Sequence, residues 1–419
     1  MNIRPPGPSN CWLAVSAALA LVSCSSPKSS ETPAQIPAPK LAAKPKPPEP
    51  QGPVFTRPQA VKGIYLTAWT AGGANSLDRQ LKLVSQTELN SVVIDVRDTG
   101  ENYFPTKIPL SDEAEKNEYL AVPKPQKLMQ KLSDAKVWPI ARIACFRDNL
   151  VTKAFPERAI QLPNGHPWQD RSRHCWLDPY NKKNWQYIAQ IVDYAMNIGF
   201  PEIQLDYVRF SSEGNSKNQV FPAKKSYEPK NSKPEDVVEA FATYISDRVR
   251  KRGRLISADI FGIISSTKGD EGIGQQLEKV AAPFDAISPM VYPSHFARGE
   301  YRIPNPNAAP YEIVYKSLND FRKRLPKKEV RPWLQAFSLG IKYGGKEIRA
   351  QIKAANDAGC TEFLLWNAGN RYTSAGLKPK TGKLAAPEGQ VEGSRERPPT
   401  DGPGKAVAAP NGASRTPHS

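Results

Sequence analysis

The chain has 419 residues, of which 58 are Lys or Arg and 41 are Asp or Glu, so its formal net charge is +17. This length allows two or three average domains, or one α/β barrel of roughly 250 residues with extensions. Such a charge suits an anionic membrane surface or an anionic polymer, and nucleic acid is the other partner that it suggests. We find no nucleic-acid-binding motif and predict no nucleic-acid partner. Only four histidines occur and no two cysteines have metal-site spacing, so we predict no metal.

The amino-terminal end has the features of an export signal. Residues 12–22 form an apolar run that is too short to span a bilayer, and Arg4 precedes it. The run ends in Leu21-Val22-Ser23-Cys24, which resembles a bacterial lipobox. We therefore predict a lipoprotein signal peptide over residues 1–24, lipidation of Cys24 and a lipid-anchored location in the cell envelope, at the outer membrane or cell surface. An ordinary cleaved signal peptide is the alternative.

Two tails flank the expected domain. Residues 25–60 are rich in Pro, Ala, Ser and Lys and contain few large apolar side chains, so we predict a disordered tether. Residues 377–419 have a similar character, which leaves residues 61–376 as one folded domain. Its three cysteines leave two possibilities open: either Cys145 pairs with Cys175, or both are buried thiols like Cys360.

Strand-like and helix-like segments alternate along this domain. Eight strands are expected, at residues 61–66, 92–96, 137–144, 203–205, 255–261, 284–291, 330–336 and 362–366. Eight β-then-α units predict a (β/α)8 TIM barrel rather than an open doubly wound sheet, with long βα loops after strands 2, 3 and 4. No glycine-rich dinucleotide turn follows the first strand, and we predict no cofactor.

Asp206, at the end of the fourth strand, is the central candidate for chemistry. Strand alternation places Gln204 and Asp206 on one face, and on the fifth strand it places Ser257 with Asp259. Carboxyl groups at the ends of neighbouring strands would lie ~5–9 Å apart, the range that two-carboxylate glycosidases use. That chemistry needs one group ionised and the other protonated. A lone aspartate after a strand has a simpler interpretation, because it can cap the following loop.

The other strand ends are also polar or aromatic. Arg142 or Arg209 could pair with Asp206 and keep it ionised, and tryptophans could form flat platforms for sugar rings. Each residue taken alone has a structural interpretation, but their convergence on one end of the barrel favours a site. The candidate substrate-binding residues are Asp95, Arg97, Asp98, Arg142, Arg209, Tyr292, His295, Trp333, Gln335, Trp366 and Asn367.

Five motifs in order resemble the bacterial putative glycosyl hydrolase domain family, a TIM-barrel family related to the α-amylase-type glycosidases. They are Lys62-Gly63-Ile64-Tyr65-Leu66-Thr67, Val93-Ile94-Asp95-Val96-Arg97-Asp98, Leu205-Asp206-Tyr207-Val208-Arg209-Phe210, Ser257-Ala258-Asp259-Ile260-Phe261-Gly262 and Ser288-Pro289-Met290-Val291-Tyr292-Pro293-Ser294-His295. The resemblance covers residues 61–373 and implies a secreted or envelope protein that acts on carbohydrate. By position Asp206 matches the nucleophile, whereas related enzymes usually carry Glu where this chain has Asp259.

The leading hypothesis is a lipid-anchored glycoside hydrolase that cleaves an O-glycosidic bond in an extracellular or envelope polysaccharide. Asp206 would be the nucleophile or stabilising base and Asp259 the general acid. The alternative is a non-catalytic barrel that binds polysaccharide or peptidoglycan through its aromatic residues and basic loops. A lyase on the same barrel would need a strand-end Lys or a metal cluster, and we find neither among the strand ends.

Overall fold

The structure is a computed structural model that describes residues 52–114 and 120–380. The predicted signal peptide, Cys24 and most of both predicted tails lie outside the described residues. Within the described ranges, no helix has the length and apolar character needed to cross a membrane.

Parallel strands close into a barrel, which confirms the predicted (β/α)8 fold. β1 (Lys62–Leu66) pairs with β2 (Ser91–Asp98) on one side and with β10 (Phe363–Trp366) on the other, so the sheet has no open end there. The other positions are taken by β4 (Trp138–Ala144), β5 (Glu202–Asp206), β6 (Leu255–Phe261), β7 (Ala286–Met290), and β8 (Glu329–Val330) together with β9 (Trp333–Gln335). A short β3 (Glu101–Asn102) pairs antiparallel with β2.

All eight predicted strands are present, and the seventh is divided. The sequence predicted one strand over residues 330–336, whereas β8 and β9 are separated by Arg331 and Pro332. Pro332 has no backbone N–H to donate to the ladder, which accounts for the break. Both pieces pair with β7, so together they occupy one position in the barrel.

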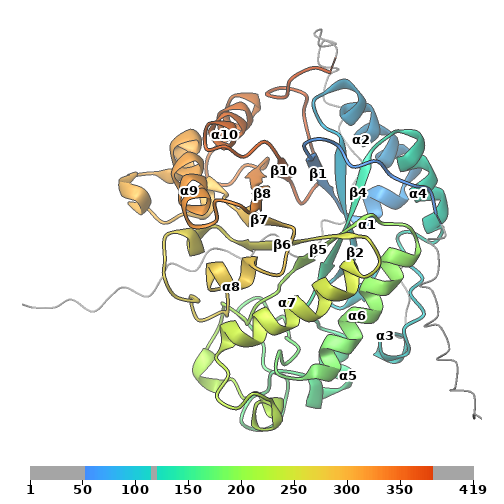
Figure 1. The fold of residues 1–419 in the computed structure, drawn as a ribbon, viewed down its shortest axis with the longest axis vertical. Helices are drawn as coiled ribbons and strands as arrows, with labels where there is room; N and C mark the ends of the chain where they lie inside the picture. The colour runs from blue at the N-terminus through green and yellow to red at the C-terminus, as the bar shows by residue number, and fades with distance from the viewer. Residues whose placement is uncertain (1–51, 115–119, 381–419) are drawn as a thin grey trace, which may run out of the picture. The chain divides into compact units, whose positions relative to one another are not determined.

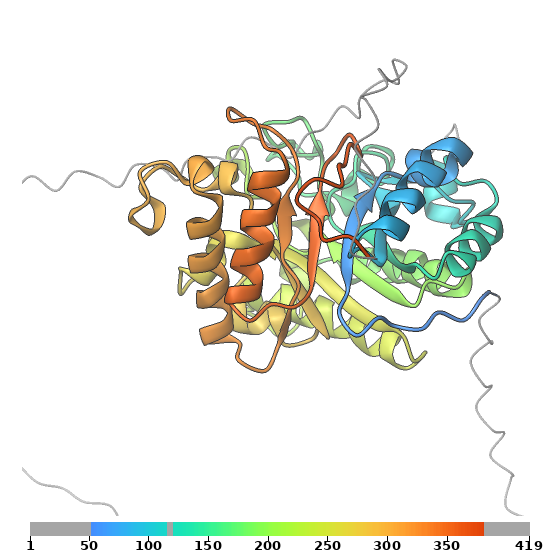
Figure 2. The same ribbon diagram turned by 90° about the horizontal axis from the view of Figure 1, so that it is seen from above.

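Helices surround the strands (Figure 1). The longer ones are α2 (Ala74–Gln86), α4 (Pro125–Asp134), α6 (Lys182–Asn197), α7 (Pro234–Arg250), α9 (Pro310–Arg324) and α10 (Gly345–Asp357), and the shorter ones are α1 (Ala68–Gly72), α3 (Pro109–Ala114), α5 (Val151–Ala154) and α8 (Leu277–Ala281). Proline begins several of them, where its missing N–H costs nothing. α9 and α10 lie side by side (Figure 2).

The regular alternation of strand and helix is incomplete in the second half. The five-residue α8 is the only α-helix between β6 and β7, next to a short 3-10 helix at Gly262–Ser265, and no helix follows β10 in the described chain up to Lys380. The segment after β10 is instead held by side chains, since the hydroxyl of Tyr372 donates to the carbonyl of Tyr65 (2.8 Å) and Asn370 bonds Thr67. The predicted (β/α)8 barrel is confirmed, with a short helix in the unit that follows β6.

The barrel contacts extend past both predicted boundaries. Arg57, placed in the tether, lies 2.7 Å from Glu362. At the other end the backbone N–H of Lys378 donates to Glu88 (2.8 Å). The three cysteines of the described chain are buried free thiols, so Cys145 and Cys175 form no disulfide.

A buried ion network fills the amino-terminal end of the barrel. Arg331 bonds Glu202 at 2.7 Å and Glu362 at 2.8 Å, and all three side chains are almost completely buried. Glu202 also accepts from Ser257 (2.7 Å) and from the indole of Trp138 (3.0 Å). Each carboxylate is thus satisfied by several donors, as buried charges require.

Removing Arg331 should destabilise the barrel strongly. Arg331→Met leaves Glu202 and Glu362 buried without their cation, which should cost about 3–5 kcal/mol of unfolding free energy. Urea denaturation at pH 7 measures the loss. Lys131→Met is the control, because Lys131 pairs with Asp78 at an exposed position and should change the free energy of unfolding by at most about 1 kcal/mol. Equal losses in the two variants would contradict a structural role for the network.

Candidate active site

Arg142 gathers carboxyl groups from neighbouring strands at the carboxyl end of the barrel. From β4, its Nη1 donates to Oδ1 of Asp95 on β2 (2.5 Å). Its Nε and Nη2 donate to Oδ2 of Asp206 on β5 (3.0 and 2.6 Å). Oδ2 of Asp259 on β6 lies 3.9 Å from the same Nε. All four side chains are buried, so this end of the barrel interior is a charged cluster rather than an apolar core.

The carboxyl groups of Asp206 and Asp259 lie close together. Leu205 pairs with Ala258 in the parallel ladder, and the two aspartates directly follow that pair. Because Arg142 Nε is 3.0 Å from one Oδ2 and 3.9 Å from the other, the two Oδ2 atoms are at most 6.9 Å apart. This limit falls inside the ~5–9.5 Å that two-carboxylate glycosidases span.

The surroundings favour a proton on Asp259. Its Oδ1 accepts from Gln204 (2.7 Å) and from the indole of Trp333 (2.6 Å), and the residue is 2 % exposed. Burial, and then the charge of Asp206, raise the pKa of Asp259 well above the ordinary aspartate value. Asp206, by contrast, receives two hydrogen bonds from a guanidinium. The two carboxyl groups therefore have different surroundings: Asp206 is bonded to a cation, whereas Asp259 is buried among neutral donors.

Asp95 completes the cluster. The hydroxyl of Tyr65 donates to its Oδ2, and Arg142 bonds its Oδ1. Burial raises the pKa of Asp95 to about 6, although the Arg142 charge opposes the shift. A single guanidinium thus faces three carboxyl groups in a buried space.

Aromatic rings line the same end of the barrel. Tyr65 stacks on Trp366 with ring centroids 4.0 Å apart, and Trp333 meets Trp366 edge to face at 5.4 Å. The Arg142 guanidinium lies 5.4 Å from the Trp366 ring centroid. Tyr292 is buried in the same cluster, and burial followed by the charge of Asp259 raises its pKa well above the ordinary value.

His295 lies at the edge of this group. Its ring centroid is 5.4 Å from that of Tyr292, and Nδ1 is 3.0 Å from the Ser294 hydroxyl. Burial lowers the pKa of His295, which favours the neutral imidazole.

Several predicted candidates lie apart from the carboxyl cluster. A β-bulge between Asp95 and Arg97 reverses the alternation, so Arg97 turns outward to Asp148 and over the ring of Tyr187 on α6 (5.3 Å). Asp98 instead bonds Arg147 (3.2 Å). Burial alone would raise the pKa of Asp98, but the Arg147 and Arg142 charges outweigh it and lower the pKa.

Gln335 and Asn367 bond the loop backbone. The Gln335 amide accepts from Ser294 N–H and donates to the Phe337 carbonyl (both 3.0 Å). The Asn367 amide donates to the carbonyls of Ala336 (2.6 Å) and Arg371 (2.9 Å). Their observed bonds fix the rim of the barrel.

Sequence reasoning missed Tyr65 and the amide of Gln204, which bond the carboxyl cluster, and Arg147, which bonds Asp98 beside it. Tyr65 alternates with Gly63 on β1 and so faces inward, a signal that was available. Arg147 lies in a loop, and its position over the Tyr207 ring, 3.9 Å from the centroid, has no periodic signature.

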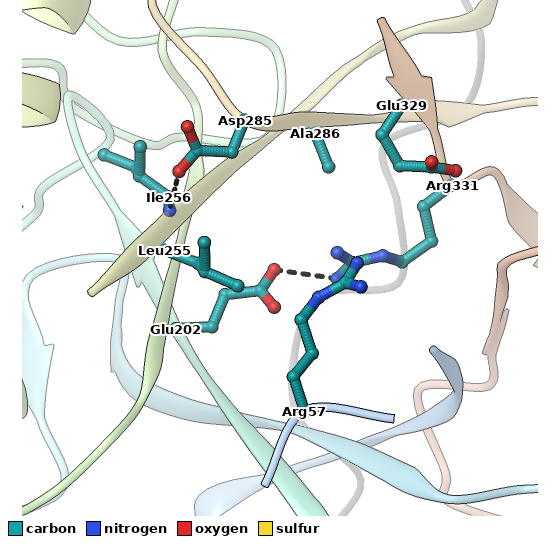
Figure 3. Close-up of a pocket in the computed structure, with 8 residues that line it drawn as sticks. All are labelled: Arg57, Glu202, Leu255, Ile256, Asp285, Ala286, Glu329 and Arg331. Carbon is teal, nitrogen blue, oxygen red and sulfur yellow. Dashed lines mark hydrogen bonds and ion pairs between the residues drawn. The ribbon is translucent and has the colours of Figure 1, made fainter. Parts of the chain in front are cut away.

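A cavity of about 250 Å³ lies at the opposite, amino-terminal end of the barrel (Figure 3). Its lining residues are Arg57, Glu202, Leu255, Ile256, Asp285, Ala286, Glu329 and Arg331. Glu202 and Arg331 already neutralise one another there, and in this fold the amino end serves stability while the carboxyl end carries the chemistry. We therefore assign the candidate site to the Arg142 cluster. Over residues 52–114 and 120–380, no group of three or more His, Cys, Asp or Glu side chains is arranged as a metal site.

Comparison with known proteins yields a family match. Residues 63–372 match the family described as "Putative glycosyl hydrolase domain". No curated protein matches the chain. The comparisons leave the predicted relation to α-amylase-type glycosidases untested.

Solved structures are similar to parts of the chain. A hypothetical protein from Ruminiclostridium thermocellum is 30% identical over 47% of this chain and 96% of its own, with a TM-score of 0.42. The PgaB (BpsB) glycoside hydrolase domain from Bordetella bronchiseptica is 13% identical over 74% of this chain and 94% of its own, with a TM-score of 0.57. At that identity, the second likeness shows the fold alone.

The raised pKa of Asp259 predicts a pH-dependent stability difference. A carboxyl group whose pKa is raised by folding binds its proton more tightly in the folded state, so its contribution falls as pH rises above ~4, by about 1.4 kcal/mol per pH unit, until the folded-state pKa is reached. Asp259→Asn keeps an acceptor oxygen for Gln204 and Trp333 but cannot ionise. Its stability relative to wild type should therefore increase with pH above 4, as measured by urea denaturation at several pH values. Asp247→Asn, at an exposed position on α7, should show no such trend. A constant difference for Asp259→Asn would contradict the assignment.

Proposed function

The chain belongs to the putative glycosyl hydrolase domain family, and on this premise we propose that it hydrolyses O-glycosidic bonds of a polysaccharide with Asp206 and Asp259. The observation that carries the proposal is the pair itself: two carboxyl groups at most 6.9 Å apart, one bonded to Arg142 and the other with a raised pKa. A glycosidase needs this combination of an ionised and a protonated carboxyl group.

In the proposed mechanism Asp206 attacks or stabilises the oxocarbenium-like carbon. Its Oδ2 is held by Arg142, while Oδ1 accepts only from the N–H of Tyr207 in the described chain (2.6 Å). Tyr207 has a φ of 52°, a left-handed conformation that is strained for a non-glycine residue and concentrates at functional sites. This backbone turn fixes the carboxylate at the strand end.

Asp259 would protonate the leaving oxygen and then activate water. Retaining enzymes separate their carboxyl groups by about 5–5.5 Å and inverting enzymes by about 6.5–9.5 Å. The 6.9 Å limit, which applies to the two Oδ2 atoms, admits the retaining separation and the short end of the inverting range, and of the two outcomes we propose retention of configuration. Arg142 would keep Asp206 ionised while Asp259 cycles between its two states.

A second candidate function is glycan binding without catalysis. The enclosure of Asp259 favours it, since this residue is 2 % exposed whereas Asp206 is 8 % exposed. The stacked rings of Tyr65 and Trp366 would serve a binding protein equally well.

Asp206→Asn should abolish hydrolysis, lowering the rate by at least about 10³-fold, because the amide cannot act as nucleophile or carry the stabilising charge. The assay is release of reducing ends from a panel of neutral and acidic polysaccharides, with circular dichroism to verify the fold. Asp259→Asn should also lose activity, and Asp247→Asn on the surface of α7 is the matched control that should keep it.

Hydrolysis by Asp206→Asn at the wild-type rate would refute the assignment. If wild type releases no reducing ends but retains a glycan in a binding assay, and Asp206→Asn/Asp259→Asn retains it equally, the binding function replaces the catalytic one.

We also propose that Cys24 is lipidated and anchors the protein to the cell envelope. The support is Leu21-Val22-Ser23-Cys24, together with the basic residues of the following segment. In a bacterial host, Cys24→Ser should abolish incorporation of labelled palmitate and shift the protein from the membrane fraction to the soluble fraction. Unchanged labelling and fractionation would contradict the anchor.

A further inference from the structure

Arg209 differs from the other buried arginines in its lack of an acidic partner. The described residues include five buried arginines, Arg97, Arg142, Arg147, Arg209 and Arg331. Each of the other four forms an ion pair with at least one carboxylate. Arg209 is 6 % exposed, yet no carboxylate oxygen of the described residues lies within 4.0 Å of it. A buried guanidinium without a counter-charge is costly unless something else neutralises it.

The side chain is held beside the candidate catalytic pair. Its guanidinium lies 4.6 Å from the ring centroid of Phe261 and 5.2 Å from that of Tyr207. Phe261 ends β6 two residues after Asp259, and Tyr207 directly follows Asp206. The ring of Trp176, from the long loop after β4, packs on the same guanidinium at 4.8 Å.

The backbone around Arg209 is also fixed. The N–H of Phe210 donates to the carbonyl of Ile273 (2.8 Å). Gln275 accepts from the N–H of Phe261 (3.0 Å) and donates to the carbonyl of Val208 (3.4 Å). The loops after β5 and β6 are therefore tied together at this point, so Arg209 is positioned before any ligand arrives.

One edge of the guanidinium remains without a partner. Nη1 donates to the Phe210 carbonyl (3.0 Å) and to the Ser212 hydroxyl (3.2 Å). Nε and Nη2 donate to no residue in the described chain. An edge formed by Nε and Nη2 can bind a carboxylate with two parallel hydrogen bonds. Burial lowers the pKa of Arg209, although the more distant charges of Asp206 and Glu213 oppose the shift.

We propose that Arg209 binds the carboxylate of an acidic sugar unit next to the bond that is cleaved, so that the substrate is an acidic polysaccharide. The inference rests on the proposed glycan-processing function. Asp206 is not the missing partner in this arrangement, because it pairs with Arg142 and no ion pair within 4.0 Å joins it to Arg209 in the described chain. The carboxylate can belong to a uronate or to the lactyl group of a muramic acid, and the test separates these sources.

Binding of sugar pairs that differ in the carboxylate tests the proposal on the full chain. The probes are glucuronate against glucose, galacturonate against galactose, and N-acetylmuramate against N-acetylglucosamine, with affinities from calorimetry or ligand-detected NMR. At least one acidic member should bind wild type about tenfold or more tightly than its neutral partner, as a charge-assisted bidentate contact implies.

Arg209→Gln should remove that preference, so that the acidic and the neutral sugar of each pair bind with similar affinity. Arg209→Lys keeps the charge but loses the bidentate edge, so it should retain only part of the preference. Arg79→Gln, which removes an exposed charge on α2, is the matched control and should bind as wild type does. If Arg209→Gln fails to fold, Arg209→Lys with thermal denaturation as a folding check carries the test.

Absence of any acidic preference in wild type would overturn the proposal, as would a preference that survives in both Arg209 variants. Those results would leave Arg209 as a cation packed on aromatic rings. The outcome is separate from that of the catalytic assignment, because binding needs no turnover. If hydrolysis depends on Asp206 but wild type shows no preference for acidic sugars, the proposed function stands and this inference fails. If wild type prefers acidic sugars but hydrolyses no glycan, this inference stands and the catalytic function fails.

Discussion

The pairing of one buried guanidinium with carboxyl groups from three strands governs the carboxyl end of this barrel. Arg142 bonds Asp95 and Asp206 and lies 3.9 Å from Asp259. One positive charge cannot neutralise three ionised groups in a space that water barely reaches, so the least well compensated group keeps its proton. That group is Asp259, whose acceptors are satisfied by the neutral donors Gln204 and Trp333. The raised pKa of Asp259 therefore follows from its burial and from the number of carboxyl groups in the cluster.

A second cluster of arginine and carboxylate side chains lies at the amino-terminal end of the barrel, and its charges are balanced differently. Arg331 also bonds two carboxylates from different strands, but there the charges are nearly matched and Arg57 contributes a further cation to Glu362. The two carboxylates that Arg331 bonds are each held by several donors, and the raised pKa at this end belongs to Glu329, through its burial and the charge of Glu362. The amino-terminal network can therefore act as a structural clamp, while the surplus acid at the carboxyl end provides a group capable of proton transfer.

The alternation of inward and outward residues and the number of strands made the fold and the Asp206–Asp259 pair predictable. Gln204 and Asp206 face inward because Ile203 and Leu205 take the outer face of β5, and Asp259 faces inward because Ala258 and Ile260 take the outer face of β6. The bulge that turns Arg97 outward was not predictable, since an inserted residue leaves no mark in a hydrophobic pattern. The choice of Arg142 over Arg209 as the partner of Asp206 was also not predictable, because Arg209 lies in the loop after β5, where strand alternation no longer applies. Gln335 and Asn367 bond nearby loop backbone, a contact that residue type alone does not reveal.

The burial of Asp259 affects both its pKa and its access to a substrate. The contacts that exclude water from this carboxyl group raise its pKa, and they also leave it only 2 % exposed. A substrate entering from the strand ends therefore meets Asp206 before Asp259, and the acid can act only on a sugar held close to the Trp333 and Tyr292 side chains. A glycan is held tightly only if contacts at the rim of the barrel are fixed. Arg209 is a positioned charge at this rim, and its Nε and Nη2 donate to no residue in the described chain. A weakly held glycan would leave the proton of Asp259 out of reach, so positioning at the rim and proton transfer within the barrel depend on each other.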